Sequence, residues 1–253
     1  MEETWRTAIS TYDARRILIR GYPIEALMEQ VSFGDLAFLL LSGRLPTQKE
    51  ARLWNAILVA VADHGPTPPS TMAARVIASG NRRAAEAAVA GGLLAIGDAH
   101  GGAGEDAMRM LYAGLQASQA RPLQAVAEEV VTRHRAEGRR IPGIGHRVHD
   151  PDPRTVVLWR MAREEGIAQE PIAFMEAIAE AASRSSGRPL PVNVDGALAA
   201  VLVGMGFPPE VGKLAFLLGR CAGIAAHVLE EWTRERPMRI HVPFTYDGPV
   251  PTD

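Results

Sequence analysis

Apolar side chains recur through most of this chain at the spacing of an amphipathic α-helix. The pattern is clearest after Thr47, where the letters TQKE match a capping box and the following apolar positions are Leu53, Trp54, Ile57, Leu58 and Val61. Positions three and four residues apart lie on one face of a helix, so this segment predicts a helix with one buried side.

The same pattern returns several times, separated by loops that contain glycine or proline. Gly65 and the prolines that follow it end the first helix, and Ser70 can cap the next one. Further helices are predicted over residues 82–96, 106–117, 123–136, 153–165, 171–184, 196–205 and 210–232. Only the segments ISTY and RILIRGY, which flank Asp13 and Ala14, favour a short N-terminal β-hairpin. The predicted fold class is therefore mainly α.

Composition narrows the class of protein. The 253 residues are 47% hydrophobic, which is enough for one large core or for two unequal lobes that share a cleft. The 27 basic residues balance 29 acidic ones, so no overall field draws the chain to nucleic acid or to an anionic membrane. The N-terminal segment MEETWRTAIS lacks the features of a secretory signal, and no apolar run reaches the length of a membrane span. The single cysteine, Cys221, excludes an intramolecular disulfide. We expect a globular, cytoplasmic enzyme.

Three histidines in glycine-bearing loops are the first candidates for chemistry. His64, in ADHGP, is expected at the end of the helix that follows Thr47, where a histidine can simply interact with the helix dipole. His100 precedes paired glycines in GDAHGGAGEDA, which either let a substrate approach the backbone or form a plain turn. His146 lies in IPGIGHRVHDPDPR, whose Gly-x-Gly-His core can present backbone groups to a ligand.

The loop around His146 does not match the known nucleotide-binding motifs. No Gly-Lys-Ser/Thr follows it and no strand precedes it, which disfavours nucleotide hydrolysis. His146 and His149 could ligate a metal together, but no carboxylate–histidine helix or cysteine pair supports such a site. We therefore expect no metal.

A carboxylate and an arginine complete the candidate set. Asn193 and Asp195 lie at the start of the apolar segment NVDGALAAVLVGMG, where either residue can cap a helix. A carboxylate against an apolar wall also has a raised pKa, which suits proton transfer at carbon. Arg220 and His227 are seven residues apart and share a helix face, and Arg220 in so apolar a segment indicates an anion site. No serine or cysteine arrangement indicates an acyl-enzyme, so proton transfer at carbon is favoured over nucleophilic catalysis.

Taken in order, the motifs of this chain resemble those of the citrate synthase superfamily over nearly the whole length. They are RGYPIEAL, SFGDLAFLLLSGRLPT, ADHGP, STMAARVIAS, AHGGA, GIGHRV, DPR, NVD and GRCAGIAAHVLEE. The resemblance implies a helical fold in which residues 1–115 and 205–253 form a large domain and residues 116–204 a smaller one, with the active site in the cleft. ADHGP, GGLLAIGD, GIGHRV and NVDG are most similar to citryl-CoA lyases and to the citryl-CoA lyase module of ATP-citrate lyase. A single helix separates GRLP from ADHG, where typical synthases insert several more.

The resemblance also implies roles for individual residues. His100, His146 and Asp195 match the catalytic trio of the family. The groups that hold the carboxylates of the substrate are matched by His64, Arg154, Arg220 and Arg236. The family places the equivalent of Arg236 in the neighbouring subunit's site, which implies a homodimer or a dimer of dimers.

Coenzyme A recognition is carried over to the loop before His146. The resemblance implies that the backbone of Pro142, Gly143, Ile144 and Gly145 contacts the adenine and that Arg147 meets the phosphates. A basic cluster nearby could also meet the phosphates but is equally explained as a solvated helix face; it comprises Arg133, Arg135, Arg139 and Arg140.

The implied reaction is cleavage of citryl-CoA, or a close 3-hydroxy-3-carboxyacyl-CoA, to acetyl-CoA and oxaloacetate. A coenzyme A thioester is then a substrate, and no tightly bound cofactor is expected. Two alternatives remain open. One is a short citrate or 2-methylcitrate synthase, because the lyase module of ATP-citrate lyase has an aromatic residue where His100 stands and synthases keep a histidine. The other is a catalytically silent paralogue that binds an acyl-CoA or a partner subunit.

Overall fold

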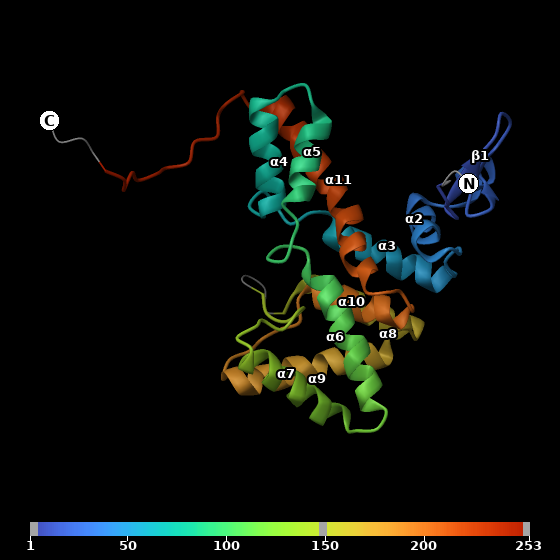
Figure 1. The fold of residues 1–253 in the computed structure, drawn as a ribbon, viewed down its shortest axis with the longest axis vertical. Coiled ribbons are helices and arrows are strands. Elements are labelled where there is room, and N and C mark those ends of the chain that lie inside the picture. The colour runs from blue at the N-terminus through green and yellow to red at the C-terminus, as the bar shows by residue number, and fades with distance from the viewer. Residues whose placement is uncertain (1–4, 147–150, 250–253) are drawn as a thin grey trace.

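The computed structural model describes residues 5–146 and 151–249. Within them the chain forms eleven α-helices and one small antiparallel sheet, which confirms the predicted mainly α class (Figure 1). The sheet consists of β1 (Ser10–Tyr12), β2 (Ile17–Ile19) and β3 (Tyr22–Pro23), in that order. Its first two strands are the predicted hairpin, with Ser10 opposite Ile19. The third strand is an addition that the sequence pattern did not predict.

The helices account for the remaining regular structure. They are α1 (Ile24–Gln30), α2 (Phe33–Ser42), α3 (Gln48–Ala62), α4 (Pro69–Gly80), α5 (Ala85–Leu94), α6 (Ala103–Ser118), α7 (Leu123–Ala136), α8 (Pro153–Glu165), α9 (Gln169–Ser186), α10 (Val194–Gly204) and α11 (Glu210–Arg234). The pattern did not predict α1 or α2, although Ser32 and Asp35 form a capping box at the start of α2. The capping box at Thr47 does begin α3, as predicted.

The longest helix, α11, joins the two groups of helices visible in Figure 1. One group contains α4 and α5, the other contains α6 to α10, and α11 contacts α3, α4, α5, α6 and α10. By length and hydropathy α11 alone among the described helices could cross a membrane, but 44% of its most apolar window is buried inside the protein. Its buried Arg220 and Glu231 also fit a core helix.

The division into a large and a small domain stays a prediction.

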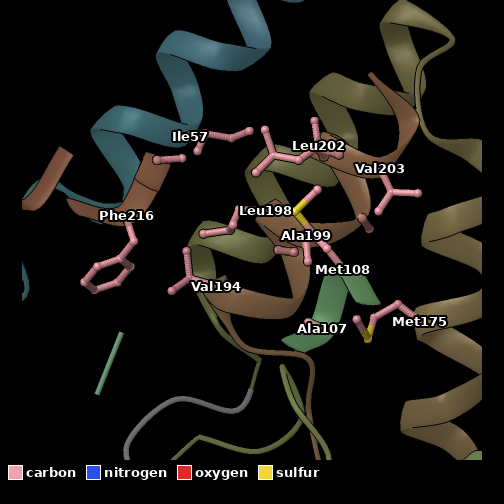
Figure 2. Close-up of a cluster of buried hydrophobic side chains, with 14 of the residues drawn as sticks. Ile57, Ala107, Met108, Met175, Val194, Leu198, Ala199, Leu202, Val203 and Phe216 are labelled. Atoms are coloured by element: carbon pink, nitrogen blue, oxygen red, sulfur yellow. The ribbon is translucent and has the colours of Figure 1, made fainter. Parts of the chain in front are cut away.

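Helix α10 lies at the centre of the hydrophobic core. Its residues from Ala197 to Val203 are all buried, and Figure 2 shows Leu198 and Leu202 among Ile57, Met108 and other apolar side chains from neighbouring helices. A helix that is apolar on every side is stable only when it is surrounded in this way. The first turn of α10, which contains Asp195, is therefore fixed against the core.

Candidate active site

Asn193, and not Asp195, caps α10. The side-chain Oδ1 of Asn193 accepts hydrogen bonds from the backbone N–H groups of Asp195 and Gly196, at 3.0 and 3.3 Å. The carboxyl group of Asp195 is therefore released from capping. Its Oδ1 is inaccessible to solvent and has no hydrogen-bond partner among the described residues. A buried carboxyl oxygen without a partner is costly, and such groups are concentrated at functional sites.

The loop that carries His146 is held against the segment before α10. Asn193 donates from its backbone N–H to Gly143 O at 3.0 Å and from Nδ2 to Gly145 O at 2.8 Å, and Gly145 N–H donates to Pro191 O at 2.7 Å. Gly143 has a φ of +79°, and a Cβ there would lie 2.5 Å from Gly196 Cα, so only glycine fits this contact. These bonds bring His146 to the start of α10.

The loop was expected to contact adenine through its backbone, but two of its backbone N–H groups already donate hydrogen bonds within the protein. The N–H of Ile144 donates to Ile141 O at 3.3 Å, and that of Gly145 is used by Pro191. Those two amide groups therefore hydrogen-bond within the protein. Arg147 and His149 lie outside the described residues.

His100 is fixed by a tight turn and by a buried serine. Its backbone exchanges hydrogen bonds with Gly97 at 2.9 and 3.0 Å, and its Nε2 lies 2.9 Å from Ser70 Oγ. Ser70 is fully buried in the first turn of α4 and does not cap that helix, so the expected capping role is wrong. Sequence analysis missed Ser70 as a site residue.

The two glycines after His100 are closely packed against other residues of the protein. A Cβ at Gly101 would lie 2.5 Å from the ring of Phe216, and one at Gly102 would lie 2.6 Å from Gly97 O. The ring of Phe216 also meets that of His100 edge to face, with 6.1 Å between centroids. Close packing around His100 therefore explains this glycine pair without any contact between backbone and substrate.

The rings of His64 and His146 lie next to each other, edge to face. Their ring centroids are 5.7 Å apart, with an interplanar angle of 72°. The sequence suggested that His64 is the last residue of its helix. Helix α3 ends at Ala62, so His64 lies in the loop two residues beyond it.

Arg220 is a buried cation with unused donor capacity. Its side chain is 2% exposed, its Nε donates to Val61 O at 2.8 Å, and its guanidinium lies 4.8 Å from the centroid of the Phe216 ring. Its Nη1 is buried and has no hydrogen-bond partner in the described part of the chain. An arginine in this state is suited to an incoming carboxylate, and the anion site at Arg220 stays a prediction.

Arg154 already pairs with a carboxylate of this chain. Its Nε and Nη2 donate to Asp152 Oδ1 and Oδ2 at 3.0 and 2.8 Å, and Asp152 is fully buried. Burial tends to raise the pKa of Asp152, but hydrogen bonds and charge from Arg154, with a smaller effect of His146, lower it overall. Asp152 is a second residue that sequence analysis missed.

The charges of these groups act on one another. Burial raises the pKa of Asp195 to about 6, against the opposing effects of Arg154 and Arg220. Burial and the nearby charges of Arg220 and His64 lower the pKa of His100. The carboxyl group therefore binds a proton more readily than usual and the imidazole less readily, which is a useful pairing for acid–base chemistry.

A pocket of about 790 Å³ opens beside His146. Four arginines line it, namely Arg135, Arg139, Arg140 and Arg188, together with apolar residues such as Ile144, Leu190 and Pro191. Arg133 of the predicted basic cluster is not among the lining residues, and Arg188 was not predicted. The combination of cationic and apolar walls suits a ligand with a flat ring and several phosphates.

One predicted residue lies away from this site. Arg236 is exposed and follows the C-terminal end of α11, roughly 20 Å along that helix from Arg220 at about 1.5 Å per residue. Residues 235–249 contain no helix or strand. Met238 and Arg239 still bond to α4 and α11, and the residues after them lead away from the helices (Figure 1). In the part of the chain that the structure describes, no group of three histidine, cysteine or acidic side chains could hold a metal ion.

The chain is similar to known proteins over most of its length. The model of the citrate synthase C-terminal domain family matches residues 3–55 and 48–241. The solved structure of citryl-CoA lyase from Hydrogenobacter thermophilus is 40% identical, with a TM-score of 0.89, and the match covers 99% of this chain and 97% of that one.

Two curated relatives are longer proteins. A probable ATP-citrate synthase of Caenorhabditis elegans is 31% identical over 249 residues, which cover 90% of this chain and 22% of that protein. A citrate synthase of Haloferax volcanii is 30% identical over 227 residues, which cover 88% of this chain and 56% of that protein. The chain thus spans about a fifth to just over half of these relatives.

Proposed function

Because this chain belongs to the citrate synthase family, we propose that it is a citryl-CoA lyase, which cleaves citryl-CoA to acetyl-CoA and oxaloacetate. The observation that carries the proposal is the degree of similarity: the chain matches a citryl-CoA lyase over nearly its whole length at 40% identity with a TM-score of 0.89. Two solved citrate synthases matched over more than 90% of their length are only 20% and 22% identical, with TM-scores of 0.61 and 0.57. The site chemistry supports the same reaction. It combines a carboxyl group with a pKa of about 6, that of Asp195, with two histidines and an arginine suited to bind an anion.

In this proposal His146 accepts the proton of the citryl hydroxyl group. The C–C bond then breaks, its electron pair passes to the thioester side, and the hydroxyl carbon becomes the keto carbon of oxaloacetate. His100 donates a hydrogen bond to the thioester oxygen, where the negative charge of the enolate develops. A positioned acid or base contributes about 10²–10⁴-fold to such a step.

Ser70 assists by fixing the proton on His100. The lowered pKa of His100 favours the neutral ring. If Ser70 donates its O–H to Nε2, then Nδ1 carries the ring proton and can donate it toward the enolate oxygen.

Asp195 completes the reaction by protonating the carbon of the enolate. Its raised pKa lets the carboxyl group hold a proton at a pH where an ordinary aspartate is ionised. Arg220, whose Nη1 has no partner among the residues that the structure describes, holds a carboxylate of the substrate, and His64 contacts the oxaloacetate portion. The arginine-lined pocket beside His146 takes the phosphates and adenine of coenzyme A.

Product analysis from one substrate tests this function. Purified protein is incubated with citryl-CoA and the products are separated by chromatography. Oxaloacetate and acetyl-CoA as main products support the lyase. Citrate and free coenzyme A as main products would identify a synthase-like hydrolysis, and an absence of products would favour another acyl-CoA or a silent paralogue.

A further inference from the structure

Helix α11 contacts three consecutive residues at the end of α3. Arg220 donates to the carbonyl of Val61, a Cβ at Gly223 would collide with the carbonyl oxygen of Ala62, and His227 binds the side chain of Asp63. These contacts hold the C-terminal end of α3 against α11, so the start of the loop after α3 is fixed in position. That loop carries His64.

Asp63 holds the backbone immediately after His64. Its Oδ2 accepts a hydrogen bond from Gly65 N–H at 3.0 Å. Its Oδ1 lies 3.0 Å from His227 Nε2. Burial tends to raise the pKa of Asp63, but the Gly65 amide, His227 and the His64 amide together lower it, so the group is a stable anion and a strong acceptor.

The orientation of His227 is set from its other side. Arg75 Nη1 lies 3.2 Å from His227 Nδ1, and an arginine can only donate, so Nδ1 is the acceptor. The ring proton then resides on Nε2 and points at Asp63. Arg75 is itself held by ion pairs with Glu230 and the fully buried Glu231, at 2.8 and 2.9 Å. A chain of hydrogen bonds therefore runs from the core of α4 and α11 to the His64 loop.

We propose that Asp63 and His227 are positioning residues, which hold His64 in the orientation that binds substrate. The proposal deepens the function proposed above and rests on it, because His64 acts there as a substrate contact. Gly65 has a φ of +83°, a conformation that glycine adopts without a steric penalty. A displacement of about 1 Å in a contacting group can cost on the order of 10²-fold in rate, so a fixed carboxylate at this point has a direct effect on catalysis.

A set of His227 variants tests the proposal. His227→Leu removes the donor to Asp63, and we expect it to lower kcat/KM for citryl-CoA by about 10-fold or more. His227→Gln can place an amide N–H where Nε2 stood and should restore most of the activity. Trp232→Phe is a matched control, because it removes a hydrogen bond from α11 to Ala78 O without touching Asp63; it should reduce stability and leave kcat/KM within about 2-fold.

A double-mutant cycle with His64→Ala separates positioning from general structural damage. If His227 acts through His64, then His227→Leu should change kcat/KM by less than about 2-fold once His64 is already alanine. A full additional loss in that background would overturn the proposal, as would a Gln variant as poor as the Leu variant in folded protein.

Hydrogen exchange at the Gly65 amide gives a readout that does not depend on activity. The amide should be protected in wild type and in His227→Gln, and should exchange at least about 10-fold faster in His227→Leu. If wild type does not cleave citryl-CoA, the proposed function fails, but the exchange result still tests whether His227 orders the loop. Unchanged exchange in His227→Leu would contradict the positioning role directly.

Discussion

The side-chain oxygen of Asn193 accepts a hydrogen bond from the backbone N–H of Asp195 at 3.0 Å, and this bond separates two functions that the sequence left combined. Asn193 stabilises the start of α10, while Oδ1 of Asp195 has no hydrogen-bond partner among residues 5–146 and 151–249. Asn193 therefore caps the helix, and the carboxyl group of Asp195, two residues later, is left for the proton transfer proposed above.

Substitution of Asp195 by Asn should remove activity but not the fold. We expect Asp195→Asn to lower kcat by about 10²-fold or more, because an amide cannot shuttle a proton. The free energy of unfolding at pH 7 should not fall, since Asn193 provides the cap. Steady-state kinetics and urea denaturation check the two parts, and near-normal kcat would remove Asp195 from the mechanism.

The pH dependence of stability should carry the signature of a buried acid. The pKa of Asp195 is about 6 in the folded state, above the 3.8 of an ordinary aspartate. Between those values the unfolded chain ionises first, so wild type should lose stability relative to Asp195→Asn as pH rises from about 4 to about 6, and no further above that. Urea denaturation of both proteins across this range measures the difference; a constant difference would show that burial does not perturb this carboxyl group.

Removal of the Ser70 hydroxyl should affect chemistry through His100. We expect Ser70→Ala to lower kcat by about 10-fold with a smaller change in KM, because the imidazole loses the bond that sets its proton and orientation. Ser79→Ala is the matched control, since Ser79 is a buried serine of the same helix whose hydroxyl has no partner among the described residues. Equal losses in both variants would mean that Ser70 serves only packing.

The arginines of the pocket should determine the affinity for coenzyme A. Arg140→Ala and Arg188→Ala should each raise KM for citryl-CoA several-fold, and the effect should diminish at high salt because phosphate contacts are electrostatic. Arg133→Ala, a change in a nearby arginine that does not line the pocket, should leave KM unchanged. Calorimetric titration with coenzyme A alone distinguishes phosphate binding from effects on the acyl group.

Arg236 should act in the site of a second copy of the chain. Arg236→Ala and Asp195→Asn proteins are each expected to be inactive, but after subunit exchange a hybrid dimer would contain one intact site. Mixing should therefore restore part of the activity. If labelled subunits demonstrably exchange and activity does not return, then each site is built from one chain.

The sequence by itself determined the helical class, the hairpin and most of the candidate residues. Helical periodicity and the capping box at Thr47 are local features, and the order of the motifs follows the chain itself. All three can therefore be read without a structure. They placed His100 and His146 on loops, and Asp195 and Arg220 on two helices, that the structure brings together. They did not reveal α1 and α2.

Only the tertiary structure decided which partner each of these groups has. Ser70 is 30 residues from His100, and Asp63 is 164 residues from His227, yet each pair is in hydrogen-bond contact. Such a contact produces no periodicity, because it depends on how α4 and α11 pack against the loops and not on the spacing along either segment. For the same reason Ser70 resembled a helix cap in the sequence and became a partner of His100 only in the fold.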